Sequence, residues 1–70
     1  MITFDRLFVT LEKRHKTIYQ LVKDRVIGGG TLNRIRAGQS VSTDTINAIC
    51  NYLRCKPGDV IEYISDDKAP

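Results

Sequence analysis

The stretch RVIGGGTLNRIRAG, residues 25–38, holds three consecutive glycines and three arginines, so it could contact a phosphate-bearing ligand. A glycine-rich loop that binds nucleotides follows a buried strand and, in the phosphate-loop type, ends in Lys followed by Ser or Thr. Here the preceding residues LVKDR are charged and have a helical pattern, and Thr31 follows the glycines directly. The stretch is therefore not predicted to be a nucleotide-binding loop.

The same stretch can instead form a short helix that carries polar side chains to nucleic acid. From Gly28 or Gly29 onward, Leu32 and Ile35 share one helical face, while Asn33, Arg34 and Arg36 point elsewhere. Arginine can pair bidentately with guanine, and asparagine with adenine. We therefore expect Asn33 and Arg34 to contact base edges. Gly38 is expected to end this helix.

Other residues that could do chemistry do not form a recognisable site. His15 lies in a polar turn among basic residues and is expected to be solvated. Cys50 and Cys55 match the spacing of neither a redox pair nor a zinc knuckle, so we expect two reduced thiols that pack against the core. The acidic residues are scattered, and a domain this small offers little room for a closed active site. No enzyme activity, metal, cofactor or small-molecule ligand is predicted.

The length and charge favour one small domain with a polyanionic partner. A chain of 70 residues is enough for one domain, and a net charge of +3 with a pI near 9.1 favours an acidic partner such as nucleic acid. No apolar stretch approaches the roughly 20 residues that span a bilayer. The N-terminal MITFDRLF contains an acid and a base, unlike a signal peptide. We expect a cytoplasmic protein without a membrane segment.

Two helices are predicted before the glycines. The first runs from about residue 4 to 14, with Thr3 as a possible N-cap. Its apolar stripe consists of Phe4, Leu7, Phe8 and Leu11. The second begins after Thr17, because Gln20 three residues later completes a capping-box pattern. A short helix, a tight turn and a second short helix with polar and basic side chains outward are the pattern of a helix-turn-helix.

A fourth helix is predicted after the glycine that ends the third. Ser42 is its expected N-cap, and Val41 and Ile46 form a hydrophobic staple around it. Residues 57–64 can form either one more helical turn or an extended strap across the core; the short helix is preferred because Pro57 suits a first helical position. Strand-like alternation is hard to find, so the predicted fold is all-α. Residues 1–65 form the expected domain, and residues 66–70 a flexible C-terminal tail.

The residues TIYQLV (17–22), VIG (26–28) and TLNRIRAG (31–38) resemble the helix-turn-helix of Cro-like, or phage-repressor (XRE-type), domains of small bacterial regulators. The segments STDTINAIC (42–50) and CKPGDVIEY (55–63) resemble the fourth and fifth helices of single-domain members. The resemblance covers about residues 3–64. It implies a compact five-helix bundle of the lambda-repressor type that binds double-stranded DNA, commonly as a two-fold symmetric homodimer, and regulates transcription.

The resemblance also implies roles for particular residues. The recognition helix is expected at about residues 29–37, in the major groove. Thr17, Gly28, Thr31 and Ser40 fall where the family contacts phosphates, and Arg36 could add a charge there. Gly29 and Gly30 stand where members usually carry base-reading side chains, and their bare backbone could approach DNA closely.

The chain departs from the family pattern at three places. Many members have Gly where this chain has Val26, so either the turn geometry differs or Gly28 takes over the strained position. Many members have Gln where this chain has Ile18, and this Gln supports a phosphate contact. Its absence predicts weaker binding of the second helix to the DNA backbone. The bare glycines of the reading helix support an alternative function, a protein-interaction or antitoxin-like module with a reduced DNA-reading face.

Tyr19 and Tyr63 are expected at the edge of the core.

Overall fold

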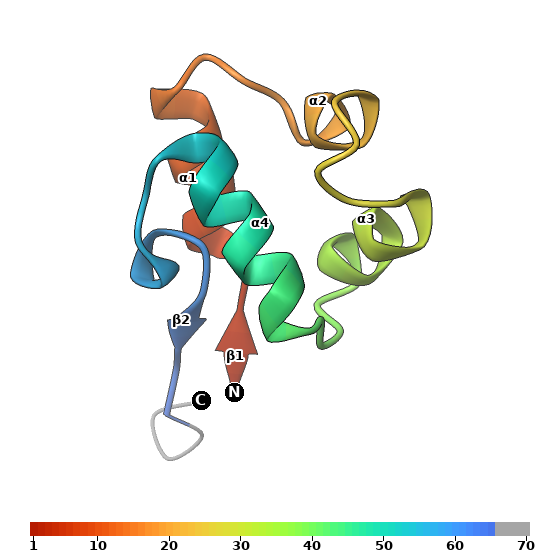
Figure 1. Ribbon diagram of the computed structural model, residues 1–70. Coiled ribbons are helices and arrows are strands. Elements are labelled where there is room, and N and C mark those ends of the chain that lie inside the picture. Colours follow the sequence, from red (N-terminus) through yellow and green to blue (C-terminus); the bar gives the residue numbers. More distant parts are fainter. Residues whose placement is uncertain (66–70) are drawn as a thin grey trace.

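The structure, a computed structural model, describes residues 1–65. In that part of the chain, four α-helices and a single turn of 3-10 helix are joined to a two-stranded sheet that brings its two ends together (Figure 1). The elements are β1 (Ile2–Thr3), α1 (Asp5–Lys13), α2 (Ile18–Lys23), α3 (Gly29–Arg36), α4 (Thr43–Leu53), η1 (Pro57–Asp59) and β2 (Glu62–Tyr63).

One apolar core receives side chains from all four helices and from the loops between them. Its buried members are Phe4, Leu7, Leu11, Ile18, Leu21, Ile27, Ile35, Ile49, Leu53 and Val60. Burying such side chains contributes roughly 1.5 to 3 kcal/mol each relative to leaving them exposed. The short helices α2 and α3 depend on this burial, because isolated helices of their length are marginal in water.

Helix α1 forms as predicted, but its start and its apolar face differ in detail. Leu7 and Leu11 are buried, whereas Phe8 is 42% exposed, so its predicted place on the inner stripe is wrong. The N-cap is Phe4, without a side-chain hydrogen bond, and not Thr3. Thr3 cannot cap the helix because it lies in β1, opposite Glu62.

Helix α4 has the predicted start and an end tied to α1. The Ser42 hydroxyl accepts a hydrogen bond from the backbone N–H of Thr45 at 3.2 Å, which confirms the predicted N-cap. At the other end, Arg14 donates to the carbonyls of Leu53 at 2.9 Å and Arg54 at 3.3 Å. A cation at a helix C-terminus also interacts favourably with the helix dipole. Arg14 therefore fixes the end of α4 against the end of α1.

The expected fifth helix is present only as one turn of 3-10 helix, and the all-α class and the count of five helices are not matched. Pro57 does begin a helical turn, but η1 ends at Asp59 and the chain then becomes extended. Val60 is fully buried and anchors this change of direction. Strand β2 pairs antiparallel with β1, with Ile2 opposite Tyr63. Residues 57–64 thus combine the two possibilities in the sequence, a short helical turn followed by an extended segment.

The predicted flexible tail, residues 66–70, lies outside the described residues. Within the described part, none of the helices has the length and apolar character needed to cross a membrane.

Candidate nucleic-acid interface

Helices α2 and α3 are held at a fixed angle by buried side chains. Ile18 and Leu21 from α2, Ile27 from the turn and Ile35 from α3 all belong to the same core cluster. The predicted helix-turn-helix is therefore present as a packed unit. Leu32 of α3 also packs against this core, whereas Asn33, Arg34 and Arg36 are exposed.

The strained position in the turn is Arg25. Its φ is 61°, whereas Gly28 has φ −87° in an extended conformation. The backbone N–H of Val26 donates to the carbonyl of Leu21 at 2.8 Å, as in a Schellman motif closing α2. The sequence left two possibilities, a turn geometry that differs from the family's or a strained Gly28. The structure shows the first, because the positive φ lies at Arg25 and not at Gly28. A β-branched residue is thus spared a positive φ.

The first turn of α3 is bare. Gly28, Gly29 and Gly30 are all exposed, and a Cβ added at any of them would meet no atom within 4 Å. Positive φ is absent from all three, so neither crowding nor backbone strain requires glycine here. What the glycines provide is an uncovered backbone at the N-terminus of α3.

Two exposed arginines stand on opposite flanks of α3. Successive residues are about 100° apart around a helix, so Arg34 and Arg36 are separated by about 200°. Asn33 is also exposed and lies between them on the side away from Ile35. The two arginines therefore face different neighbouring elements.

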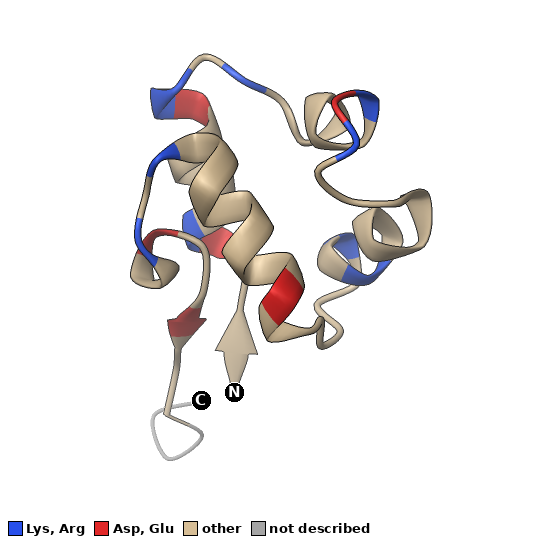
Figure 2. Cartoon of the chain, viewed as in Figure 1, with Lys and Arg blue, Asp and Glu red and all other residues tan. Residues whose placement is uncertain are grey.

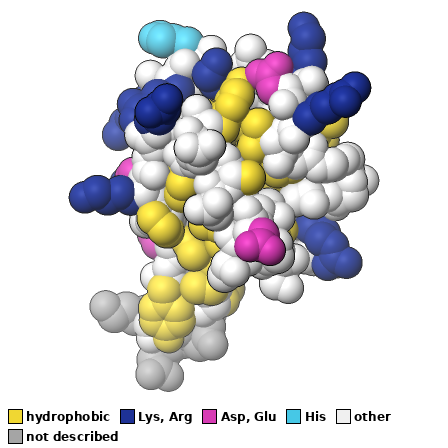
Figure 3. Space-filling view, viewed as in Figure 1, with side chains coloured by type: hydrophobic (Ala, Val, Ile, Leu, Met, Phe, Trp, Pro, Cys, Tyr) yellow, Lys and Arg dark blue, Asp and Glu magenta, His cyan; other side chains and the backbone are white. Residues whose placement is uncertain are grey.

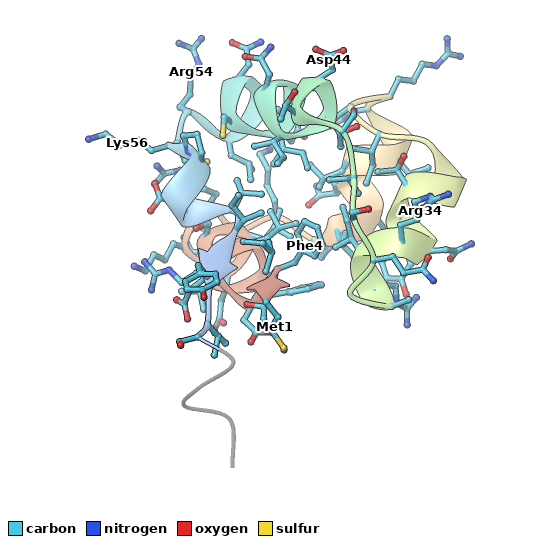
Figure 4. The ribbon with its side chains drawn as sticks, turned by 90° about the horizontal axis from the view of Figure 1, so that it is seen from below. Met1, Phe4, Arg34, Asp44, Arg54 and Lys56 are labelled. Carbon is cyan, nitrogen blue, oxygen red and sulfur yellow. The ribbon has the colours of Figure 1, made fainter. Side chains whose placement is uncertain are left out.

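Arg34 lies on the flank beside the N-terminus of α4. It borders a shallow hollow of about 320 Å³ whose lining is mostly hydroxyl-bearing: Thr31, Arg34, Ser40, Val41, Ser42 and Thr45. Figure 4 shows Arg34 on α3, far from Arg54 and Lys56 at the other side of the molecule. A helix N-terminus favours negative charge, and Arg34 adds a full positive charge. Asp44, in the first turn of α4, opposes this field.

Arg36 lies on the other flank, against α2. Its Nη1 donates to the hydroxyl of Tyr19 at 2.9 Å, and its guanidinium carbon lies 5.8 Å from the centre of the Tyr19 ring. Tyr19 is 58% exposed, so its predicted place at the edge of the core is wrong. Tyr63, at 68%, is likewise exposed.

The start of α2 is fixed locally, and its end is fixed by contact with α4. The backbone N–H of Thr17 donates to the side-chain oxygen of Gln20 at 2.7 Å, half of the predicted capping box. Tyr52 on α4 donates its hydroxyl to the carboxylate of Asp24, and this hydrogen bond raises the pKa of Tyr52. The Lys16 ammonium lies 5.1 Å from the centre of the same ring.

Positive charge is spread over several edges of the molecule. Figure 2 shows Lys and Arg in the second half of α3 and also in the loops that follow α1 and α4. In Figure 3 the basic side chains project around the rim of this face, with apolar side chains between them. The distribution of charge alone therefore does not identify a nucleic-acid-binding surface. The exposed polar residues of α3 identify the candidate surface.

Residues with metal-binding or nucleophilic side chains also occur in residues 1–65. Groups of three or more side chains able to hold a metal ion are absent there. Cys50 and Cys55 are free thiols that pack against the core, as predicted. Desolvation, with a contribution from Cys50, raises the pKa of Cys55 to about 11. Such a thiol is a weak nucleophile at neutral pH.

The structure brings three of the nine predicted site residues together at one hollow. Thr31, Arg34 and Ser40 line this hollow, while Gly28 is the N-cap of α3 and Gly29 and Gly30 begin its first turn. Thr17 is separate, as the N-cap of α2. Sequence reasoning missed the place of Ser42 and Thr45 in the hollow and the role of Tyr19 as the partner of Arg36. Both depend on contacts between elements, which local patterns do not show.

Comparisons with known proteins agree with this geometry. Residues 6–66 match a family described as the Cro/C1-type HTH DNA-binding domain. The chain is 34% identical over 61 residues to the uncharacterized HTH-type transcriptional regulator YozG of Bacillus subtilis (strain 168), covering 84% of this chain and 73% of that protein. The crystal structure of the transcriptional regulator VanUg, form II, matches with a TM-score of 0.85 at 26% identity, covering 93% of this chain and 87% of VanUg.

Proposed function

Since this chain belongs to the family of Cro/C1-type helix-turn-helix DNA-binding domains, we propose that it regulates transcription by placing α3 in the major groove of duplex DNA. The relatives named as transcriptional regulators support the regulatory role. Such a protein acts where the DNA is, in the cytoplasm of a bacterium. Its action is binding rather than catalysis.

The observation that carries this proposal is the exposed face of α3 beside a hydroxyl-lined hollow. Asn33 and Arg34 are exposed on that face, and the hollow lies at the N-terminus of α4, which is the positive end of its dipole. A base edge can be read by the two side chains, while hydroxyl groups and helix-end N–H groups suit phosphate oxygens. One surface thus offers both kinds of contact.

The contacts divide as follows. Asn33 and Arg34 contact base edges, adenine and guanine being the partners that suit their donors and acceptors. The phosphate-contacting residues are Thr17, Gly28, Thr31, Arg36 and Ser40. Gly29 and Gly30 let the backbone of α3 approach the DNA closely, since nothing covers them. Phosphate contacts position the domain without reading sequence.

The functional unit is a homodimer on a two-fold symmetric site. A single copy presents a recognition helix of eight residues with two bare glycines, which leaves few side chains for reading bases. Two copies would double the base contacts on half-sites one helical turn apart, about 34 to 36 Å. The symmetry of the preferred DNA site is the readout for this part of the proposal.

The experiment is a selection from random duplexes, followed by titration of the enriched sequence against a scrambled duplex. The expected result is a two-fold symmetric motif bound more tightly than the scrambled duplex. Enrichment of a single asymmetric site would contradict the dimer. Absence of binding to any duplex at low salt would remove the DNA-binding proposal and leave the protein-interaction alternative.

A further inference from the structure

Tyr19 and Arg36 meet across the angle between α2 and α3. Arg36 donates to the Tyr19 hydroxyl at 2.9 Å and also lies near the ring, 5.8 Å from its centre. Both side chains are exposed, Tyr19 by 58%. The contact therefore lies at the surface and leaves both polar groups accessible to a ligand.

The pair presents hydrogen-bond donors and a net positive charge. A guanidinium has five N–H donors and no acceptor, and Tyr19 occupies one of them. The tyrosine hydroxyl accepts this bond, so its own proton remains available to a further acceptor. Within residues 1–65 no carboxylate pairs with Arg36. A phosphate group, which carries negative charge and accepts hydrogen bonds, fits this combination.

The position of the pair complements that of Arg34. Arg34 faces the α4 side of α3 and Arg36 the α2 side. A helix lying in the major groove has a sugar–phosphate strand on each side of it. The flank of Arg36 is therefore where the second strand would pass, next to the first turn of α2.

We propose that Tyr19 is a positioning residue that holds Arg36 for contact with a backbone phosphate on the α2 side of the groove. This inference rests on the proposed function. An arginine side chain has a large rotamer entropy, and a hydrogen bond plus ring contact made before binding removes part of that freedom in advance. Tyr19 thereby strengthens DNA binding without reading sequence.

The test compares Tyr19→Phe, Arg36→Ala and the double variant, with Tyr63→Phe as the matched control. Tyr63 is also exposed but lies in β2, away from α3. DNA affinity is measured by anisotropy on the preferred and a scrambled duplex over a range of salt concentrations, and stability by thermal melting. The salt slope tests whether Arg36 meets a phosphate, because a purely structural brace between helices would not change it. The double variant tests whether Tyr19 acts through Arg36, because the effects of coupled residues do not add.

Arg36→Ala is expected to reduce the steepness of the log–log salt dependence by about 0.9 for each bound subunit. Tyr19→Phe keeps the charge, so the slope should persist, while affinity falls about three- to tenfold on both duplexes. In the Arg36→Ala background, Tyr19→Phe should have little further effect. The control should behave like the wild type.

Three results would overturn the inference. An unchanged salt slope in Arg36→Ala would show that Arg36 does not meet a phosphate. A lowered melting temperature in Tyr19→Phe with unchanged affinity would make the pair a brace only. Equal losses from Tyr19→Phe in the presence and absence of Arg36 would mean that Tyr19 does not act through it. A wild-type protein that fails to bind any duplex would instead refute the proposed function itself.

Discussion

Arg34 is the best residue for testing whether the protein recognises a DNA sequence, because it is exposed on α3 and borders the hollow at α4. If it pairs with a guanine, Arg34→Ala should cost about 1 to 3 kcal/mol on the preferred site and relax discrimination at one position per half-site. The measurement is a titration against duplexes with single substitutions. Lys56→Ala is the control, because Lys56 lies at the other side of the molecule (Figure 4). A uniform loss over all duplexes would mean that Arg34 contacts only phosphate.

Cys55 is expected to be an unreactive thiol at neutral pH. Desolvation and the neighbouring Cys50 raise its pKa to about 11 from an ordinary value of 9.0. The folded protein therefore holds this proton more tightly than the unfolded chain does. The free energy of unfolding should fall as the pH rises from about 9 to about 11, and be insensitive to this group below that window.

Peptide-resolved mass spectrometry after alkylation checks this expectation. Cys55 in the folded protein should react with iodoacetamide much more slowly at pH 8 than in urea-unfolded protein, and the folded rate should climb toward pH 11. Equal rates in the folded and unfolded protein at pH 8 would contradict the raised pKa.

At the scale of elements, the start of α3 can be tested through its glycines. Replacing Gly29 and Gly30 together with alanine should stabilise the fold by up to about 1 kcal/mol for each residue, because nothing obstructs a Cβ at either position. If the bare backbone approaches DNA closely, the added methyl groups should weaken binding at the same time. Melting curves and anisotropy titrations of the one variant separate the two effects.

Gly38→Ala is the matched control for that variant. Gly38 has φ +73°, so alanine there should destabilise the fold although space is free. Equal or tighter DNA binding by the double alanine variant would show that the glycines form only a loose turn. A loss of both stability and affinity would contradict the geometry described for them.

The turn between α2 and α3 offers a second test. Arg25 has φ 61°, a conformation that costs an ordinary residue roughly 1 kcal/mol or more and glycine little. Arg25→Gly should therefore raise the free energy of unfolding by about 1 kcal/mol in denaturant titrations. Val26→Gly, the change that family resemblance would favour, should not stabilise. Stabilisation by Val26→Gly alone would place the strained position one residue later.

The helices could be predicted from the sequence because their signals are local. The capping residues Thr17 and Ser42 and the closing Gly38 lie within a few residues of the ends they define. The two-residue strands are too short for alternation to be visible, and their pairing joins residues about 60 positions apart, as with Ile2 and Tyr63. Nothing in the local pattern could therefore show them.

The site was predicted in part for the same reason. That Asn33 and Arg34 would be exposed follows from helical periodicity, and the structure agrees. The partner of Arg36 lies on another helix, 17 residues earlier in the chain, so the contact with Tyr19 required the tertiary structure. The positive φ lies at Arg25, just after the end of α2, where glycine is the usual residue. The hydrogen bonds that close α2 place it there, and the preference of arginine does not predict it.

For the whole molecule, the net charge of +3 and the few cations on α3 predict a moderate salt dependence of DNA binding. Each phosphate neutralised releases counterions and contributes about −0.9 to the log–log slope, so a dimer using about three cations per subunit should show a slope near −5. Anisotropy titrations from low to moderate salt measure it. A slope near −2 would fit a single subunit bound through about two phosphates, and a flat response would exclude phosphate contacts.

The pairing of β1 with β2 also sets an order of events during synthesis. The α2–α3 unit is complete once residue 38 has been made, whereas Ile2 must wait for Tyr63 before it has a partner. Closing so long a loop has a large entropy penalty, and β1 has no partner strand until nearly the whole chain has been made. The first residues to leave the ribosome are thus among the last to reach their final place. Until then the core also lacks Ile49, Leu53 and Val60, so α2 and α3, which depend on burial in that core, become stable only after α4 and Val60 have been made.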